Sequence, residues 1–350
     1  MRTKIVNLYI VFLLGIFPLL MHDGFFDISI TKSYIYILAT ASVFLFCIVS
    51  SIWKKNWNWM LKKRNWLIYV AGFLIWINTK CAWSSTYALT GEAGRYQGAY
   101  VYWAYCVGAL CILNFGSFRE CFLDVAITSG ACTGIIAILN FYEVDVLNTM
   151  FQLSEGQRHL YISTIGNTNI YSAYLSIITP IAMIKAIMEE DRKKRILYDL
   201  ATMCLFGAMI ASRCDSVYIT LLILAGFVPF YALPYVNRRI RMLVQFVLLT
   251  SVLLGMNLLN HRLMYPLGYV DGISRHFLDT DICAALFVIS VCLAAGCCFL
   301  GKRLESITVK QWRISWFCIA GIGFLAEAFF YVIHTVFDGN WGSYRGFIWM

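Results

Sequence analysis

Residues 166–180 read Gly-Asn-Thr-Asn-Ile-Tyr-Ser-Ala-Tyr-Leu-Ser-Ile-Ile-Thr-Pro. Four small or polar residues pass directly into an apolar run that continues to Met188. A run of roughly 20 apolar residues is long enough to cross the hydrocarbon core of a bilayer as a helix. The stretch therefore predicts a membrane-spanning helix that begins in a polar loop.

The composition extends this prediction to the whole chain. It is 60% hydrophobic and 13% charged, with a mean hydropathy of +0.70, whereas soluble domains are about 25% charged. Only helices and closed barrels satisfy their backbone in lipid, and the alternating pattern of barrel strands, about 10 residues long, is absent. We expect an all-α fold, a polytopic transmembrane helical bundle in which the protein meets the lipid bilayer.

The apolar runs predict about eleven spans. No small-x-small cleavage site precedes His22, so we expect the first run to be retained rather than removed as a signal peptide. We divide the chain into residues 1–64, with two spans, and residues 65–350, with spans 3–11 and the start of an outer loop. The expected spans cover about residues 1–20, 34–53, 66–77, 98–115, 122–142, 170–188, 196–211, 216–236, 242–259, 282–300 and 314–337.

The basic residues predict the orientation of these spans. If the chain crosses the membrane at each span, 20 of its 28 Lys and Arg residues fall on one side. Positive residues are retained on the cytoplasmic side. This places the N-terminus in the cytoplasm and the C-terminus outside, in a multi-pass membrane protein.

The net charge of +9 does not predict nucleic-acid binding, because the basic residues lie in short loops between spans. The 13 Cys residues are scattered, mostly within apolar runs, and no Cys-x-x-Cys pair occurs. They are typical of small apolar side chains in helices. We expect no metal site and no cofactor.

Four polar clusters interrupt the apolar pattern, and all four fall on the predicted outer side. Gly94-Arg-Tyr-Gln-Gly98 opens a span, and it contains both a Gly-x-x-x-Gly helix-packing pattern and Arg95 and Gln97, which could contact a ligand. Arg donates paired hydrogen bonds to phosphate. We therefore weigh a packing surface against a phosphate contact.

The second and third clusters allow the same two interpretations. In Gly166-Asn-Thr-Asn169, Asn167 and Asn169 could cap a helix or help an anion bind at its N-terminus. In Ser212-Arg-Cys-Asp215, Ser212 and Asp215 could form a tight turn, or they could accompany Arg213 in a binding site. A single cap explains one polar residue of the second cluster well and four poorly, which favours function there. In the third cluster, the position of Arg213 near membrane depth beside a short turn favours function.

The last cluster surrounds Arg345 in the polar tail, residues 338–350. Its tryptophans and Tyr are typical of an interfacial aromatic belt, while Arg345 could contact phosphate or sugar. Glu327 lies inside the last apolar run, where an ionisable residue is either functional or paired with another helix. His159 and His334 are weaker candidates for acid–base chemistry.

Taken in order, the motifs resemble those of the O-antigen ligase and O-antigen polymerase superfamily. The matching elements are Arg-x-Gln-Gly (95–98), Gly-Asn-x-Asn (166–169), a Ser-Arg turn (212–213) and Gly-x-x-Arg-Gly-x-Ile-Trp (342–349). Thr168 stands where the family commonly has Pro, and Cys214 where it has another small residue. The resemblance covers roughly residues 65–350.

The resemblance implies a multi-pass enzyme of the bacterial cytoplasmic (inner) membrane that acts in cell-envelope polysaccharide or lipopolysaccharide biosynthesis. Such a glycosyltransferase takes a glycan from undecaprenyl pyrophosphate and passes it to a hydroxyl of a glycan, lipid or protein acceptor. By this analogy Arg213 and Arg345 are the catalytic contacts to the pyrophosphate. Arg95, Gln97, Asn167, Asn169, Ser212, Asp215 and Glu327 bind substrate.

In the family, an outer loop with a His general base follows the segment that matches Arg345. This sequence ends at Met350, so we expect it to be truncated before that loop. The main alternative is a transporter or flippase of lipid-linked oligosaccharide, whose polar groups would lie near the membrane midplane. A scaffold protein is a third class, and it would need none of the four clusters.

Overall fold

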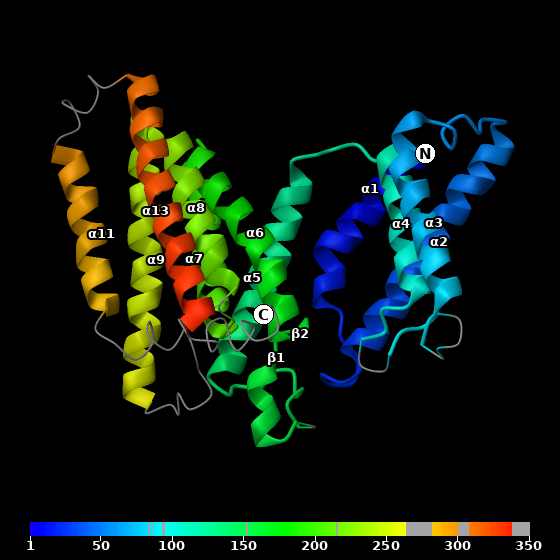
Figure 1. Cartoon of the computed structure of the whole chain (residues 1–350), viewed down its shortest axis with the longest axis horizontal. Helices are drawn as coiled ribbons and strands as arrows, with labels where there is room; N and C mark the ends of the chain where they lie inside the picture. Colours follow the sequence, from blue (N-terminus) through cyan, green and yellow to red (C-terminus); the bar gives the residue numbers. More distant parts are fainter. Residues whose placement is uncertain are drawn as a thin grey trace. The chain divides into compact units, whose positions relative to one another are not determined.

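The structure, a computed structural model, describes residues 1–82, 85, 87–92, 95–151, 153–214, 216–263, 282–299 and 308–337. In this part the chain is predominantly helical, with one two-stranded sheet (Figure 1). Six of the described helical segments are long and apolar enough to cross a membrane: Arg2–Leu19, Ile28–Trp53, Cys121–Phe141, Thr168–Met188, Val236–Arg262 and Ile282–Phe299. Ala99–Phe115 and Ser216–Ala232 are apolar but shorter.

The prediction of a helical membrane protein is thereby confirmed. The count of eleven spans and the orientation of the termini stay predictions. The chain forms two compact units, which are described separately. Unit 1 comprises Met1–Ser129 and Asp145–Glu155, and unit 2 comprises Gly130–Val144 and Gly156–Met350. The division at residue 64 likewise stays a prediction.

Unit 1 is built on three helices that pack together, α1 (Arg2–Val11), α2 (Ile28–Trp53) and α4 (Ala99–Phe115). α3 (Trp66–Cys81) packs on α4. Val6, Cys47 and Cys111, one from each of the first three helices, form a buried apolar cluster. Where the sequence predicts one span over residues 1–20, α1 continues as the π-helical η1 (Phe12–Ile16) and the 3-10 helix η2 (Phe17–Leu19), which contains Pro18.

Polar side chains join these helices at one end of unit 1. Arg2 donates to the Ser50 hydroxyl over 2.8 Å, and Asn7 donates to the Ser117 hydroxyl over 2.8 Å. The start of α1 therefore lies beside the ends of α2 and α4. The loop between α2 and α3 belongs to this end, and it contains η3 (Lys63–Asn65). Most basic residues of unit 1 lie in this loop or beside it.

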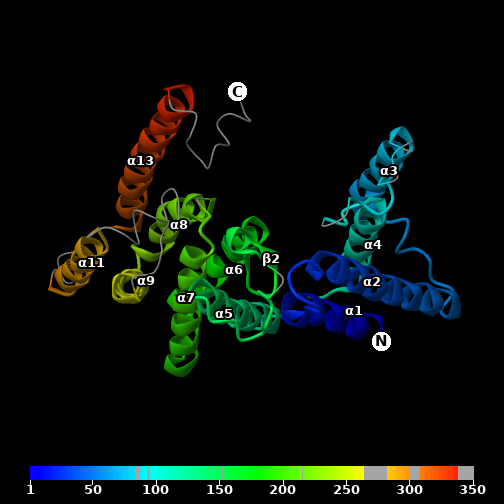
Figure 2. The ribbon, with the colours of Figure 1, turned by 90° about the horizontal axis from the view of Figure 1, so that it is seen from below.

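Unit 2 begins with the second half of α5 (Cys121–Phe141) and a small hairpin. Six helices follow in the described part: α6 (Thr168–Met188), α7 (Arg192–Ala211), α8 (Ser216–Ala232), α9 (Val236–Leu263), α11 (Ile282–Phe299) and α13 (Val309–Phe337). α6 packs on α7, α8 and α9, while α11 packs on α9 and α13 packs on α8. Figure 2 shows α6 with α5, α7 and α8 around it.

Glycines allow α5, α6 and α7 to approach closely. A Cβ atom on Gly130 would lie 2.8 Å from Ile178 of α6 and 3.1 Å from Leu205 of α7. A Cβ atom on Gly134 would lie 3.1 Å from the Cys204 sulfur. Small residues at helix interfaces are typical of membrane proteins, where close packing drives association.

The antiparallel helices give unit 2 two distinct ends. At one end, Arg241 of α9 donates to the carbonyl oxygens of Ile187 and Glu189, over 3.2 and 2.7 Å, where α6 finishes. Arg192, Lys193, Lys194, Arg195, Arg238 and Arg239 also lie at this end, at the starts of α7 and α9. The other end holds the start of α6 and the turn between α7 and α8, and few of the described residues there are basic.

Candidate functional site

A β-hairpin leads into α6 and fixes where that helix begins. β1 (Tyr161–Ile162) pairs antiparallel with β2 (Gly166–Asn167), so that Tyr161 faces Asn167 and Ile162 faces Gly166. Gly166 has a φ of 90°, a conformation that glycine adopts without steric cost. The Gly-Asn-Thr-Asn motif thus contains the second strand of the hairpin and the first turn of the helix.

A buried polar network holds the hairpin loop against α5. The backbone N–H of Ser163 donates to the Asn140 side-chain oxygen over 2.9 Å, and the Ser163 hydroxyl donates to the Thr133 carbonyl over 2.7 Å. The Tyr171 hydroxyl reaches the Thr133 hydroxyl at 3.5 Å. All four residues are buried. Because a buried polar group left without a hydrogen bond is costly, this network defines the position of the loop.

Asn167 caps α6. Its side-chain oxygen accepts hydrogen bonds from the backbone N–H groups of Asn169, at 2.9 Å, and Ile170, at 3.4 Å. Helix starts leave such N–H groups without intrahelical partners, and Asn is among the preferred caps. Two of the donors that an anion could have used are therefore occupied, so capping accounts for the oxygen of Asn167.

The turn between α7 and α8 presents Arg213 in an unusual backbone conformation. Ser212 is fully buried, and its hydroxyl donates to the Met209 carbonyl over 2.7 Å, so it ends α7 rather than facing a ligand. Arg213 follows with a φ of 55°. Residues other than glycine seldom adopt this region, and when they do the position is often functional.

The guanidinium of Arg213 lies over an aromatic ring. Its central carbon is 4.7 Å from the centroid of the Phe141 ring, which belongs to the last residue of α5. Phe141 is buried, whereas Arg213 is half-buried. A cation–π contact of this kind stabilises the cation and restricts where it lies. The cation is therefore held at the end of unit 2 where α6 begins.

Two of the predicted motifs meet here through side chains. The Cys214 thiol donates to the Asn169 side-chain oxygen over 3.3 Å and lies 2.9 Å from the Ser216 hydroxyl. Ser216 is 3.2 Å from the Ser172 hydroxyl of α6. Residues 45 positions apart in the sequence thus form one polar cluster, consisting of Asn169, Ser172, Cys214 and Ser216. We call it the α6–α8 polar cluster.

The Arg95 motif belongs to unit 1 and has a structure of its own. The loop before α4 lies across the start of that helix, and Ala99 and Tyr100 donate their backbone N–H groups to the carbonyls of Ala88 and Leu89. A Cβ atom on Gly98 would lie 2.2 Å from the Leu89 oxygen. Gly98 therefore allows close packing of this loop, not of a second helix as the Gly-x-x-x-Gly pattern would predict.

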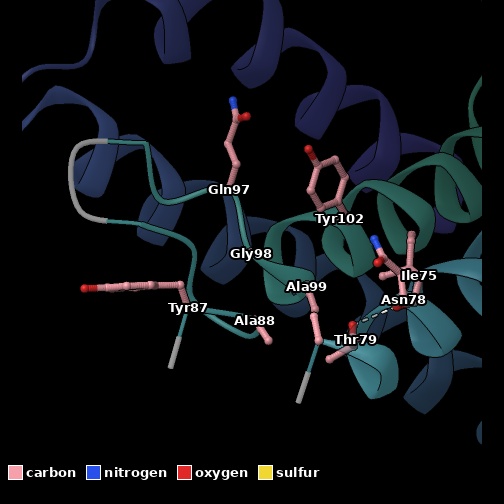
Figure 3. Close-up of a pocket in the computed structure, with 10 residues that line it drawn as sticks. Ile75, Asn78, Thr79, Tyr87, Ala88, Gln97, Gly98, Ala99 and Tyr102 are labelled. Carbon is pink, nitrogen blue, oxygen red and sulfur yellow. Dashed lines mark hydrogen bonds between the residues drawn. The ribbon is translucent and has the colours of Figure 1, made fainter. Parts of the chain in front are cut away.

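An open cavity of about 370 Å³ lies between this loop, the end of α3 and the start of α4. Its polar lining includes Asn78, Thr79, Tyr87, Gln97 and Tyr102. Figure 3 shows the Gln97 side chain on the loop and the Tyr102 ring on α4. Gln97 and Arg95 are exposed, so both are accessible to a ligand.

The remaining predicted residues are not placed at either site. Asp215 and Arg345 lie outside the described residues, and Glu327 and His334 belong to α13. His159 lies in η4 (Glu155–Leu160), directly before the hairpin. In the described part of the chain, no group of three or more His, Cys, Asp or Glu residues could hold a metal ion.

The sequence interpretation overlooked the polar residues beneath the motifs. Thr133 and Asn140 are seven positions apart on α5, a spacing that places them on one face two turns apart. Ser172 lies one turn after Asn169. Polar residues repeated at helical spacing within an apolar run are a signal that could have identified both sets.

We compared the sequence with protein-family models and with curated proteins, and the structure with solved structures. No family model matches the chain, and neither a curated protein nor a solved structure was found to match.

Proposed function

We propose that this protein transfers or polymerises a glycan carried by undecaprenyl pyrophosphate, as an O-antigen ligase or polymerase does. One observation carries the proposal. The Gly-Asn-x-Asn and Ser-Arg motifs, singled out from the sequence for this chemistry, meet through the contact between Asn169 and Cys214. Arg213 lies beside that contact, with its guanidinium held over Phe141.

The reaction explains why a fixed cation is useful at this position. The acceptor hydroxyl oxygen attacks the anomeric carbon of the donor sugar while the bond from that carbon to the pyrophosphate oxygen breaks. The pyrophosphate leaves with the electron pair, and the hydroxyl proton passes to a base. In our proposal Arg213 offsets the negative charge that develops on the leaving oxygen, which is how preorganised cations accelerate such steps.

Arg95 and Gln97 are exposed beside a cavity in unit 1, and they keep the substrate-binding role that the family resemblance implies. Asn169 contributes its amide group to the donor pocket. Arg345, Asp215 and Glu327 keep the roles that the family resemblance implies. The acceptor is a glycan, a lipid or a protein.

The distribution of charge supports an outward-facing site. In unit 2 the basic residues gather at the end where α6 finishes, opposite the α6–α8 polar cluster. The positive-inside rule assigns the basic end to the cytoplasm. The site would then face the outer side of the bacterial cytoplasmic membrane, where undecaprenyl-linked glycans are consumed by this family.

The test compares three Arg variants in the native host. Arg213→Ala should lower transfer roughly 100-fold or more, as loss of a charge-stabilising donor does in other enzymes, and lipid-linked glycan should accumulate. Arg213→Lys should retain part of the activity. Arg262→Ala removes the same charge from the last turn of α9, an exposed position, and should leave transfer unchanged.

Extracted lipid-linked glycans, resolved by chromatography and mass spectrometry, provide the readout. Wild-type transfer by Arg213→Ala would refute the role of this residue. An equal loss in Arg262→Ala would attribute the effect to general surface charge instead.

A further inference from the structure

The loop between α2 and α3 has a defined structure at the basic end of unit 1. Trp59 is buried, its indole N–H donates to the Ser51 hydroxyl over 2.8 Å, and its ring is 5.0 Å from that of Phe115. Asn65 is fully buried and donates to the carbonyls of Trp59 and Met60, over 2.7 and 3.2 Å. The loop is thus anchored at two points by side chains that face the unit interior.

An open cavity of about 490 Å³ lies beside the anchored loop. It is lined by Met60, Leu61, Lys62, Lys63, Trp66 and Tyr69. The Tyr69 hydroxyl donates to the Met60 carbonyl over 2.5 Å, which fixes the ring that forms one wall. The cavity therefore combines two ammonium groups with apolar and aromatic walls.

Among the residues that the structure describes, no ion pair to a carboxylate is found for Lys62 or Lys63. The sequence contains no Asp or Glu between residues 28 and 91, and α1 and α4, which pack on α2, contain none. Lys62 and Lys63 are both exposed. Their charges are thus available to an anion that reaches the cavity.

The apolar side chains beside the lysines are also exposed. Leu61 is 86% exposed and Trp66 is 67% exposed. In a membrane protein, such side chains next to Lys mark the interface where lipid headgroups meet acyl chains. A ligand that matches both the lysine charges and the exposed apolar side chains carries a phosphate group close to a hydrocarbon chain.

We propose that this cavity, which we call the basic-loop cavity, binds one anionic phospholipid. The phosphate contacts Lys62 and Lys63, and the glycerol and upper acyl chains pack on Trp66 and Leu61. Because the loop is already anchored by Trp59 and Asn65, binding requires little additional ordering, which favours affinity. The proposal is independent of glycan transfer.

The experiment measures lipid binding to the purified full chain in a neutral detergent, which removes the surface potential of a bilayer. Native mass spectrometry counts bound dioleoylphosphatidylglycerol and, in parallel, dioleoylphosphatidylcholine. We expect the wild-type protein to prefer the anionic lipid. Lys62→Gln/Lys63→Gln should weaken binding by at least about tenfold, since a direct hydrogen bond to a charged group contributes about tenfold or more to binding.

The same loop offers a matched control. Lys54→Gln/Lys55→Gln removes two charges that do not line the cavity, and it should change binding less than about threefold. Melting temperatures of both double variants should equal that of the wild type, because all four lysines are exposed. Trp66→Ser keeps both cavity charges and should also weaken phosphatidylglycerol binding.

Three results would overturn the proposal. The first is an absence of preference for phosphatidylglycerol in the wild-type protein. The second is an equal loss in the two double-lysine variants, which would indicate general electrostatic attraction. The third is full displacement of the lipid by an excess of glycerol 3-phosphate, which would indicate a site for the phosphate group alone.

Discussion

The thiol of Cys214 donates a hydrogen bond to the side-chain oxygen of Asn169, 3.3 Å away, and this bond joins the turn after α7 to the first turn of α6. Cys214 is 8% exposed. A thiol is a weak donor, so the bond alone does not explain why these elements meet. The hydroxyls of Ser172 and Ser216 lie beside it and extend the contact.

Replacing Cys214 tests how much this contact stabilises unit 2. We expect Cys214→Ala to lower the free energy of unfolding by about 1 kcal/mol, because the hydrogen bond from the thiol to the Asn169 oxygen is lost. Cys214→Ser keeps a donor and should remain close to the wild type. Thermal melting of the purified variants measures the difference, and equal melting temperatures for Ala and Ser would show that the bond contributes no stability.

Arg213 combines backbone strain with a proposed role in chemistry, and two substitutions separate them. Arg213→Ala keeps a Cβ atom at a φ of 55°. Arg213→Gly removes this atom and with it a steric strain of about 1 kcal/mol. We expect the Gly variant to be the more stable of the two while both lose glycan transfer. Equal stability of the Arg213→Ala and Arg213→Gly variants would contradict a left-handed backbone conformation at this residue.

Asn167 permits a comparison of capping with ligand binding. Both Asn167→Ser and Asn167→Asp keep a side-chain oxygen for the N–H groups of Asn169 and Ile170, and each should remain within about 0.5 kcal/mol of the wild type. The Asp variant adds a negative charge where we propose that pyrophosphate approaches. We expect transfer to fall at least about tenfold in Asn167→Asp and to change little in Asn167→Ser.

Parallel measurements of melting temperature and glycan transfer give both quantities for each Asn167 variant. Equal transfer by the two variants would mean that Asn167 only caps α6, and the donor would then have to bind elsewhere.

Gly98 and Gly72 form a matched pair in unit 1. A Cβ atom at Gly98 would lie 2.2 Å from the Leu89 oxygen and 2.4 Å from the Gly91 nitrogen, both backbone atoms, whereas a Cβ atom at Gly72 meets nothing within 4 Å. We expect Gly98→Ala to destabilise unit 1 by more than about 3 kcal/mol. Gly72→Ala in α3 should be neutral or stabilising by up to about 1 kcal/mol.

Fluorescence-detected size-exclusion chromatography after heating compares the two glycine variants without purification. Similar melting of both would show that the loop from Tyr87 to Gly91 does not pack against the start of α4.

The positions of the helices could be predicted, because a helix that crosses the membrane requires a long apolar run. The first and last residues of the observed helices differ from those of the predicted spans. The sequence places the start of one span near Met242, whereas α9 begins at Val236 and includes Arg238, Arg239 and Arg241. Arg is a good helix former, so a helix continues beyond the apolar run into the interface. Apolar patterning marks the lipid-facing segment and not the end of the helix.

The candidate site could be predicted only in part. The abrupt change from polar to apolar residues identified both Asn167 and Arg213. It gave no indication of the hairpin of residues 161–167, whose strands are two residues each and too short for a periodic signal. Nor could the sequence pair Asn140 with Ser163, because that bond depends on how α5 and the hairpin loop fold together.

The bonds from Arg241 to the last turn of α6 have a consequence for the order of assembly. Carbonyl groups at the end of a helix need partners from elsewhere, and the partner of the Glu189 carbonyl lies 52 residues further along the chain. During synthesis α6 and α7 are complete before Arg241 exists. The end of α6 therefore obtains the Arg241 donor only after the start of α9 has been synthesised.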